Sequence, residues 1–248
     1  MSKERLLITM GCSFTEGVGC WDMNITPPTL RTSHIEYYSF LERKENRYKF
    51  HKDGWPNRVG KKIGFDKVIN IGKGGDSTSG QVKRFINKIL PMDLSKYDVL
   101  VLFQLPQASR FSFYSNGLVN SWGNYNAKDT PLVKEYIKLL KDEDFLHEQL
   151  FYIKIMAEVC ENNSFKFLTV NLIDEDSSIN FYERNISNKI YKPQVVITGY
   201  EEISKICNHY NEHGYEMTSI RISGHVKSKL KEIANLPKKE DIEWEYIE

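Results

Sequence analysis

Ser13 is the residue whose surroundings most resemble those of a catalytic nucleophile. It follows Gly11 and Cys12 directly after the apolar run from Leu6 to Met10, which has the composition of a buried strand. A hydroxyl at the end of such a strand can act as a nucleophile, and its own backbone N–H can help to hold an oxyanion. Serine in this position also commonly caps a helix. The segment alone therefore leaves both roles open.

A glycine cluster follows a second apolar run. The segment from Asn70 to Ser79 contains Gly72, Gly74 and Gly75, and glycines let backbone N–H groups approach a ligand without interference from a Cβ atom. A phosphate-binding loop is one alternative, but neither the Gly-x-x-x-x-Gly-Lys-Ser/Thr pattern nor Gly-x-Gly-x-x-Gly is present. An ordinary strand-to-helix turn, capped by one of the following hydroxyl residues, is the other alternative.

A third polar group follows the apolar run that starts at Asp98. Gln104 and Gln107 follow this run, and either carboxamide could donate an N–H at the end of a strand. A carboxamide suits an oxyanion because it is neutral and does not titrate. Arg110 could also face the pocket, where its guanidinium would suit an anionic group.

His225 is the candidate general base. It stands just before a predicted C-terminal amphipathic helix, and its imidazole could take the Ser13 proton and return it to the leaving group. A histidine near a helix start can equally be a surface residue. We interpret the remaining histidines as residues of the surface or residues that support the site: His34, His51, His147, His209 and His213.

The elements that must position these residues alternate between strands and helices, which predicts an α/β fold with a parallel sheet. Predicted strands lie near residues 6–10, 67–71, 98–103 and 166–170. Predicted helices lie near residues 55–64, 81–90, 145–160, 201–209 and 227–235. Residues 20–54 and 111–144 are long, polar and rich in aromatic residues, so we expect them to form walls or lids of the site. The sequence predicts one domain.

Composition excludes several classes of protein. Lys and Arg number 34 against 33 Asp and Glu, so the chain lacks the positive field of a nucleic-acid-binding protein. The first apolar run is too short for the core of a signal peptide, and no run approaches about 20 apolar residues, so we expect a cytosolic protein without a membrane span. The abundance of Lys, Asn and Ile is typical of AT-rich genomes such as those of bacteriophages, in which case the location would be the host cytosol.

The four cysteines do not have the spacing of a metal site. Cys12, Cys20, Cys160 and Cys207 form no Cys-x-x-Cys pair and have no histidine at ligand spacing, so we expect free thiols and no metal or cofactor. The oligomeric state is left open by the sequence.

Taken together, the four segments resemble the conserved blocks of the SGNH/GDSL hydrolase superfamily, in the same order and over most of the chain, from Gly11 to Ala234. The resemblance implies a three-layer, flavodoxin-like α/β sandwich with about five parallel strands. It implies Ser13 as nucleophile and His225 as base. The oxyanion hole would be formed by Ser13, Gly75 and Gln107, with Gln104 as an alternative donor or substrate contact.

Two positions depart from the family pattern. Gln107 stands where asparagine is usual, and Ile222 stands where an aspartate is expected three residues before His225. Glu216 or Asp174 could hold the imidazole instead. The resemblance therefore predicts an esterase that cleaves a small acyl ester, such as one on a carbohydrate, or transfers the acyl group to a hydroxyl. The alternative is a glycan-binding protein that has the hydrolase fold without turnover.

Overall fold

The computed structural model of the 248-residue chain describes residues 3–17, 51–108, 110–115, 118–122, 135, 139–172, 194–195 and 212–247. The predicted helix at 201–209 and most of the two predicted insertions lie outside these residues.

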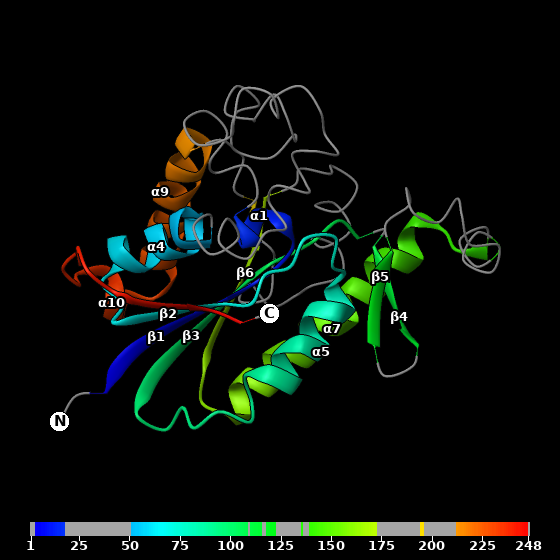
Figure 1. Cartoon of the computed structure of the whole chain (residues 1–248), viewed down its shortest axis with the longest axis horizontal. Helices are drawn as coiled ribbons and strands as arrows, with labels where there is room; N and C mark the ends of the chain where they lie inside the picture. Colours follow the sequence, from blue (N-terminus) through cyan, green and yellow to red (C-terminus); the bar gives the residue numbers. More distant parts are fainter. Residues whose placement is uncertain are drawn as a thin grey trace.

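A parallel sheet forms the centre of the fold (Figure 1). Its six strands run in the order β7-β6-β3-β1-β2-β8, and every pairing is parallel. The strands are β1 (Glu4–Met10), β2 (Lys67–Asn70), β3 (Tyr97–Gln104), β6 (Lys166–Asn171), β7 (Gln194–Val195) and β8 (Glu243–Tyr246). The predicted parallel α/β sheet is confirmed, and β8 adds a strand at one edge.

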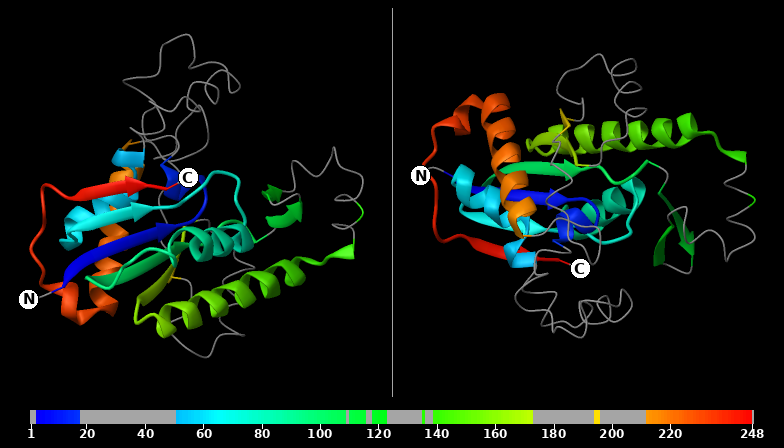
Figure 2. Two further views of the ribbon diagram at one scale, coloured as in Figure 1. Left: turned by 60° about the horizontal axis from the view of Figure 1, so that its bottom comes forward. Right: turned by 90° about the horizontal axis from the view of Figure 1, so that it is seen from above.

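Helices cover both faces of this sheet and make three layers (Figure 2). One face packs on α4 (Trp55–Ile63) and α9 (Glu212–Lys229), and the other packs on α5 (Thr78–Lys88) and α7 (Asp142–Asn162). Alternate residues of β1 serve the two cores, because Leu7 belongs to the first and Ile8 to the second. Burial on both faces explains why β1 and β3 are nearly continuous apolar runs.

Local sequence signals set the ends of α4 and α5. α4 has Pro56 in its first turn and ends at Gly64, which has φ +89°, and a Cβ there would lie 2.1 Å from the carbonyl oxygen of Pro237. α5 begins after Ser77, whose Oγ accepts the Gly80 N–H at 3.0 Å. The prediction of a hydroxyl cap after the glycine cluster is therefore confirmed for Ser77.

The predicted C-terminal helix starts much earlier than expected. The prediction of one helix near residues 227–235 is wrong, because α9 ends at Lys229 and the short α10 (Lys231–Ala234) follows. The buried face of α9 includes Thr218, Ser219 and Ser223 beside its apolar residues. These small hydroxyl residues read as polar in the sequence, which hides the helical period.

A hairpin lies within one of the predicted insertions. β4 (Phe111–Ser115) and β5 (Leu118–Trp122) pair antiparallel in a separate two-stranded sheet, beside α5. The role of residues 20–54 and 111–144 as walls or lids stays a prediction. No helix within the described ranges is both long enough and apolar enough to cross a membrane.

Candidate active site at the carboxyl edge of the sheet

Ser13 is the first residue of α1 (Ser13–Glu16), which follows β1 at the carboxyl edge of the sheet. The carbonyl of Cys12 accepts the N–H groups of Thr15 at 2.9 Å and Glu16 at 3.0 Å, so the chain turns directly from strand into helix. Gly11 has φ +154°, and a Cβ there would lie 2.3 Å from Thr15 Oγ1. Glycine is therefore required before this turn.

The glycine loop after β2 packs against the Ser13 turn. The Lys73 N–H donates to the Gly11 carbonyl at 2.9 Å, and the Gly74 N–H donates to Glu16 Oε2 at 2.6 Å. A Cβ added at Gly74 would lie 3.6 Å from Ser13 Cβ. Gly75 has φ +75°, and a Cβ there would meet no atom within 4 Å. The structure thus brings the segment that holds Gly75 to the turn that holds Ser13.

Gln104 supports this turn from the end of β3. Its side chain is fully buried, and Oε1 accepts the Cys12 N–H at 3.0 Å, Thr15 Oγ1–H at 3.1 Å and Cys12 Sγ–H at 3.1 Å. The prediction that Gln104 donates to an oxyanion or contacts substrate is wrong, because its oxygen already has three donors and its Nε2 donates to the Leu105 carbonyl. Gln104 lies behind the site.

Gln107 and Arg110 follow β3 in a turn at the same edge. Both side chains are partly exposed, and the Arg110 N–H donates to the Gln107 carbonyl at 3.1 Å. Arg110 Nη1 is buried and has no hydrogen-bond partner among the residues that the structure describes. The oxyanion role of Gln107 and the substrate role of Arg110 stay predictions.

His225 is not placed beside Ser13. The prediction that it precedes a helix is wrong, because it lies inside the C-terminal half of α9. α9 leads to α10, where Glu232 lies 3.9 Å from the Nζ of Lys166, the first residue of β6. The C-terminal end of α9 is therefore at the amino edge of the sheet, whereas Ser13 follows the carboxyl end of β1 (Figure 1).

The surroundings of His225 indicate a structural residue. Burial, followed by the charge of Lys229, lowers the pKa of His225 to about 4. Its Nε2 is buried and finds no hydrogen-bond partner within the described ranges. The imidazole is therefore neutral at pH 7, and the residue is only partly exposed.

The proposed acid partners of His225 do not reach it either. Glu216 binds Arg58 at 2.8 Å and Lys62 at 2.5 Å. Burial raises the pKa of Glu216, but these two hydrogen-bonded cations outweigh burial and leave its pKa below the usual value. Asp174 lies outside the described residues.

His51 is the histidine that the described structure places against α1. It is almost fully buried, with Nδ1 at 2.6 Å from the Glu16 carbonyl oxygen and its ring stacked on Tyr246 at 3.4 Å between centroids. Because a carbonyl only accepts, Nδ1 carries the proton of this contact. His51 is therefore not a surface residue, and its role in supporting the site stays a prediction. His147 and His213 are exposed, and His34 and His209 lie outside the described residues.

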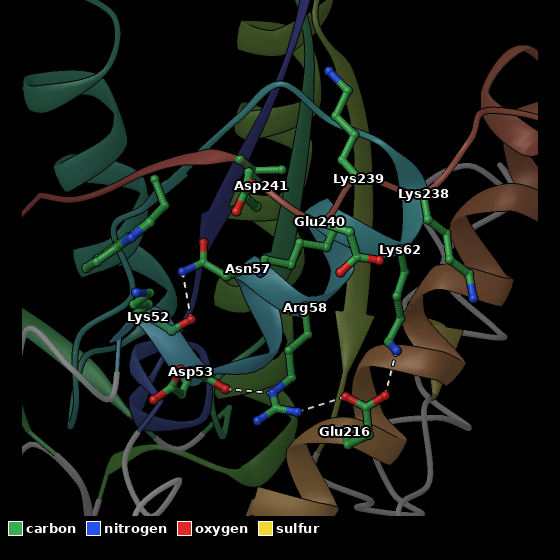
Figure 3. Close-up of a pocket in the computed structure, with 13 residues that line it drawn as sticks. Lys52, Asp53, Asn57, Arg58, Lys62, Glu216, Lys238, Lys239, Glu240 and Asp241 are labelled. Carbon is green, nitrogen blue, oxygen red and sulfur yellow. Dashed lines mark hydrogen bonds and ion pairs between the residues drawn. The ribbon is translucent and has the colours of Figure 1, made fainter.

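A charged cavity of about 550 Å³ lies elsewhere, lined by residues of α4, of α9 and of the segment 238–244 (Figure 3). Arg58, Lys62 and Glu216 line it together with residues 238–242, and Ser13 does not. The three form one ion-pair network, drawn in Figure 3. We interpret this cavity as part of the packing of α4 on α9, separate from the Ser13 site.

Metal-ligand groups are absent from the part of the chain that the structure describes, where no three His, Cys, Asp or Glu residues gather. Cys12 and Cys160 are free and buried, as predicted, while Cys20 and Cys207 lie outside the described residues. Burial raises the pKa of Cys160 to about 12, so its thiol is inert as a nucleophile.

Comparisons with known proteins rest on structure, because no family model and no curated protein matches the sequence. A carbohydrate esterase family 2 enzyme with a carbohydrate-binding domain, from Corynascus thermopiles (Myceliophthora fergusii), superposes with a TM-score of 0.58 at 11% identity, over 93% of this chain and 68% of its own. An acetyl xylan esterase from Butyrivibrio proteoclasticus gives 0.51 at 10% identity, over 93% and 66%.

A third solved structure is similar over the same extent. The family two carbohydrate esterase from Clostridium thermocellum, in complex with cellohexaose, gives a TM-score of 0.52 at 13% identity, over 93% of this chain and 66% of its own. The chain thus spans about two thirds of the length of these esterases. It has the three-layer α/β fold that the resemblance to SGNH/GDSL hydrolases predicts.

Proposed function

We propose that the protein is a serine ester hydrolase of the SGNH type, with Ser13 as nucleophile. The observation that carries the proposal is the packing of the glycine loop after β2 on the turn that presents Ser13, at the carboxyl edge of a parallel sheet. Open α/β sheets bind ligands at this edge. A fold shared with carbohydrate esterases supports an ester as the substrate.

In the proposed reaction, Ser13 Oγ attacks the ester carbonyl while a base accepts its proton. The N–H groups of Ser13 and Gly75 and the Nε2 of Gln107 hold the negative oxygen of the tetrahedral intermediate. The intermediate collapses, the alcohol leaves with the proton from the base, and an acyl-enzyme remains. Water then attacks the acyl-enzyme and releases the acid, or a hydroxyl of another molecule takes the acyl group.

The base belongs in the segment that enters α9 rather than at His225. The C-terminal end of α9 lies at the amino edge of the sheet. Its first turn, which begins at Glu212, is at the other end of the helix and so lies toward the carboxyl edge that holds Ser13. His213 is in this first turn. His209 precedes α9 by three residues in the sequence and lies outside the described structure. We propose one of these two histidines as the base.

The substrate class follows from the shared fold and from one side chain. Two of the similar structures are a xylan esterase and an esterase that binds cellohexaose, which favours acyl groups on a carbohydrate. Arg110 Nη1, which is buried and has no partner in the described part of the chain, favours a substrate that also carries an anionic group. Nothing in the proposal requires a metal or a cofactor.

A glycan-binding protein without turnover is the second candidate. The displacement of His225 from Ser13 is the observation that favours it, because the predicted nucleophile–base pair does not form. Such a protein would bind the same oligosaccharides and leave their acyl groups in place.

Hydrolysis assays separate the two candidates. Purified protein is incubated with p-nitrophenyl acetate and with acetylated xylo-oligosaccharides, beside Ser13→Ala, His209→Ala, His213→Ala and His225→Ala. The proposal predicts that Ser13→Ala and one of the first two histidine variants lose activity by at least about 10³-fold, while His225→Ala keeps it. Sugar binding without hydrolysis in the unmodified protein would establish the second candidate instead.

A further inference from the structure

Two buried glutamines connect the three segments that hold the proposed oxyanion donors. Gln104 is the last residue of β3, and Gln81 lies in α5. Both side chains are fully buried. Each accepts a backbone N–H from the turn before Ser13, because Gly11 donates to Gln81 at 3.2 Å and Cys12 donates to Gln104 at 3.0 Å.

Gln81 links this turn to the glycine loop. While its Oε1 accepts from Gly11, its Nε2 donates to Asp76 Oδ2 at 2.9 Å, and Asp76 directly follows Gly75. Arg84 holds the same carboxylate oxygen at 3.0 Å, and the Ser77 N–H donates to the other oxygen at 2.9 Å. Gln81 thus adds a side-chain link between Gly75 and Ser13, beside the backbone contacts of Lys73 and Gly74 with the same turn.

Gln104 links the same turn to the segment after β3. Its Nε2 donates to the carbonyl of Leu105, two residues before Gln107, while its Oε1 accepts from Cys12 and Thr15. A backbone donor on one side and a backbone acceptor on the other fix which end of the carboxamide carries the oxygen. The amide therefore cannot be replaced by an acceptor alone.

We propose that Gln81 and Gln104 are positioning residues that hold Ser13, Gly75 and Gln107 at the spacing that oxyanion binding needs. This inference rests on the proposed function of the site. Oxyanion donors act only when they lie about 2.7–3.1 Å from the developing charge, and displacement by about 1 Å can cost about 100-fold in rate. Loss of either glutamine link should therefore lower kcat and leave KM nearly unchanged.

Both links need a neutral side chain that donates and accepts at once. Replacing either glutamine by glutamate should therefore make its link depend on pH. In Gln81→Glu a carboxylate would face Asp76, and in Gln104→Glu it would face the Leu105 carbonyl. Burial raises the pKa of the new carboxyl in both variants, and in Gln81→Glu the charge of Asp76 raises it further, although Arg84 offsets part of that charge. The protonated acid can still donate with one oxygen and accept with the other, so each link persists at low pH and breaks as pH rises through the raised pKa.

Gln149→Glu is the matched control. Gln149 is also buried and donates through Nε2, to Thr78 Oγ1 at 2.9 Å and to the Pro106 carbonyl at 2.9 Å, but none of these groups belongs to the turn before Ser13. Gln149→Glu should therefore lower the free energy of unfolding as pH rises, but should leave the turn before Ser13 in place.

The test compares the three variants with the unmodified protein at pH 5.5 and pH 8.5. The first readout is kcat and KM for p-nitrophenyl acetate, and the second is the alkylation rate of the Cys12 thiol relative to unmodified protein at the same pH. Gln81→Glu and Gln104→Glu should fall within about threefold of the unmodified protein at pH 5.5. At pH 8.5 their kcat should be about 10- to 100-fold lower at similar KM, with faster Cys12 alkylation.

Two outcomes overturn the inference. One is unchanged kcat and Cys12 protection in both variants at pH 8.5, and the other is an equal increase in Cys12 alkylation in Gln149→Glu. If Gln104→Glu unfolds at pH 8.5, Gln81→Met supplies the same comparison, because it removes both the acceptor for Gly11 and the donor to Asp76 without adding a charge. If the unmodified protein has no esterase activity, the proposed function fails while the Cys12 readout still decides whether the glutamines hold the turn.

Discussion

The backbone N–H of Gly74 donates to the Oε2 of Glu16 at 2.6 Å, and this carboxylate is almost fully buried. The bond joins the helix that begins with Ser13 to the glycine loop after β2. A buried hydrogen bond to a carboxylate is among the stronger ones in proteins. It therefore keeps the loop against the nucleophile turn.

Replacement of Glu16 by alanine should loosen this junction. We expect the free energy of unfolding to fall by about 1.5–3 kcal/mol, because the Gly74 N–H loses a charged acceptor. We also expect a loss of kcat of about 10- to 100-fold from misplaced donors. Urea unfolding and steady-state kinetics measure the two effects, and an activity equal to that of the unmodified protein would show that the loop is held by other contacts.

Gly72 and Gly75 should respond very differently to alanine. At Gly72 a Cβ would lie 2.8 Å from Thr15 Cβ and 2.9 Å from the Glu16 backbone nitrogen, which cannot move without shifting α1. At Gly75 the space is open, and the cost is the left-handed conformation alone, about 1–2 kcal/mol. Thermal unfolding of Gly72→Ala and Gly75→Ala should show the larger loss for Gly72. Equal losses would contradict this description of the loop.

His225 should make the fold sensitive to acid. Burial and the charge of Lys229 lower its pKa from 6.5 to about 4. Between about pH 6.5 and pH 4, His225 is therefore protonated in the unfolded chain but neutral in the folded chain. Stability is therefore full above pH 6.5 and falls as pH falls toward 4, by roughly 1–2 kcal/mol after allowance for partial exposure. Urea unfolding at pH 7.5 and pH 5 measures the loss.

The matched variant for this prediction is His225→Gln, which does not titrate. It should lose less stability between pH 7.5 and pH 5 than the unmodified protein does, while esterase activity at pH 7.5 stays the same. A large loss of kcat in His225→Gln at pH 7.5 would instead support the original prediction that His225 is the base.

Gln107 should contribute to kcat if its amide meets the oxyanion. Gln107→Ala is expected to lower kcat by about 10²–10³-fold with little change in KM or in the melting temperature, because the side chain is partly exposed. Gln107→Asn has a shorter side chain, and its kcat should lie between those of Gln107→Ala and the unmodified protein. An unchanged kcat in Gln107→Ala would remove this residue from the oxyanion hole.

The central fold could be predicted from the sequence because its strands are buried on both faces. Continuous apolar runs mark β1 and β3 directly. The edge strand β8 has the sequence Glu-Trp-Glu-Tyr, with alternate residues exposed, and such a short polar strand gives no comparable signal. The start of α9 is not evident from the sequence for a related reason. Hydroxyl residues occupy much of its buried face, so the apolar period of the helix is weak.

The site was predicted in part for similar reasons. Gly11, Ser13 and the glycine loop are neighbours in the structure because they follow adjacent parallel strands, which a sequence pattern can indicate. Whether Gln104 faces substrate or core depends on which way the last residue of β3 points. A strand that is apolar on both faces does not reveal this, and neither does the sequence reveal the tertiary links of Gln81.

The most direct test of the account is to locate the adduct of a fluorophosphonate probe by mass spectrometry of the folded protein. We expect one adduct, on the peptide that contains Ser13, absent in Ser13→Ala and in protein unfolded by urea. An adduct on another residue, or none on a folded protein that binds acylated oligosaccharides, would contradict Ser13 as the nucleophile.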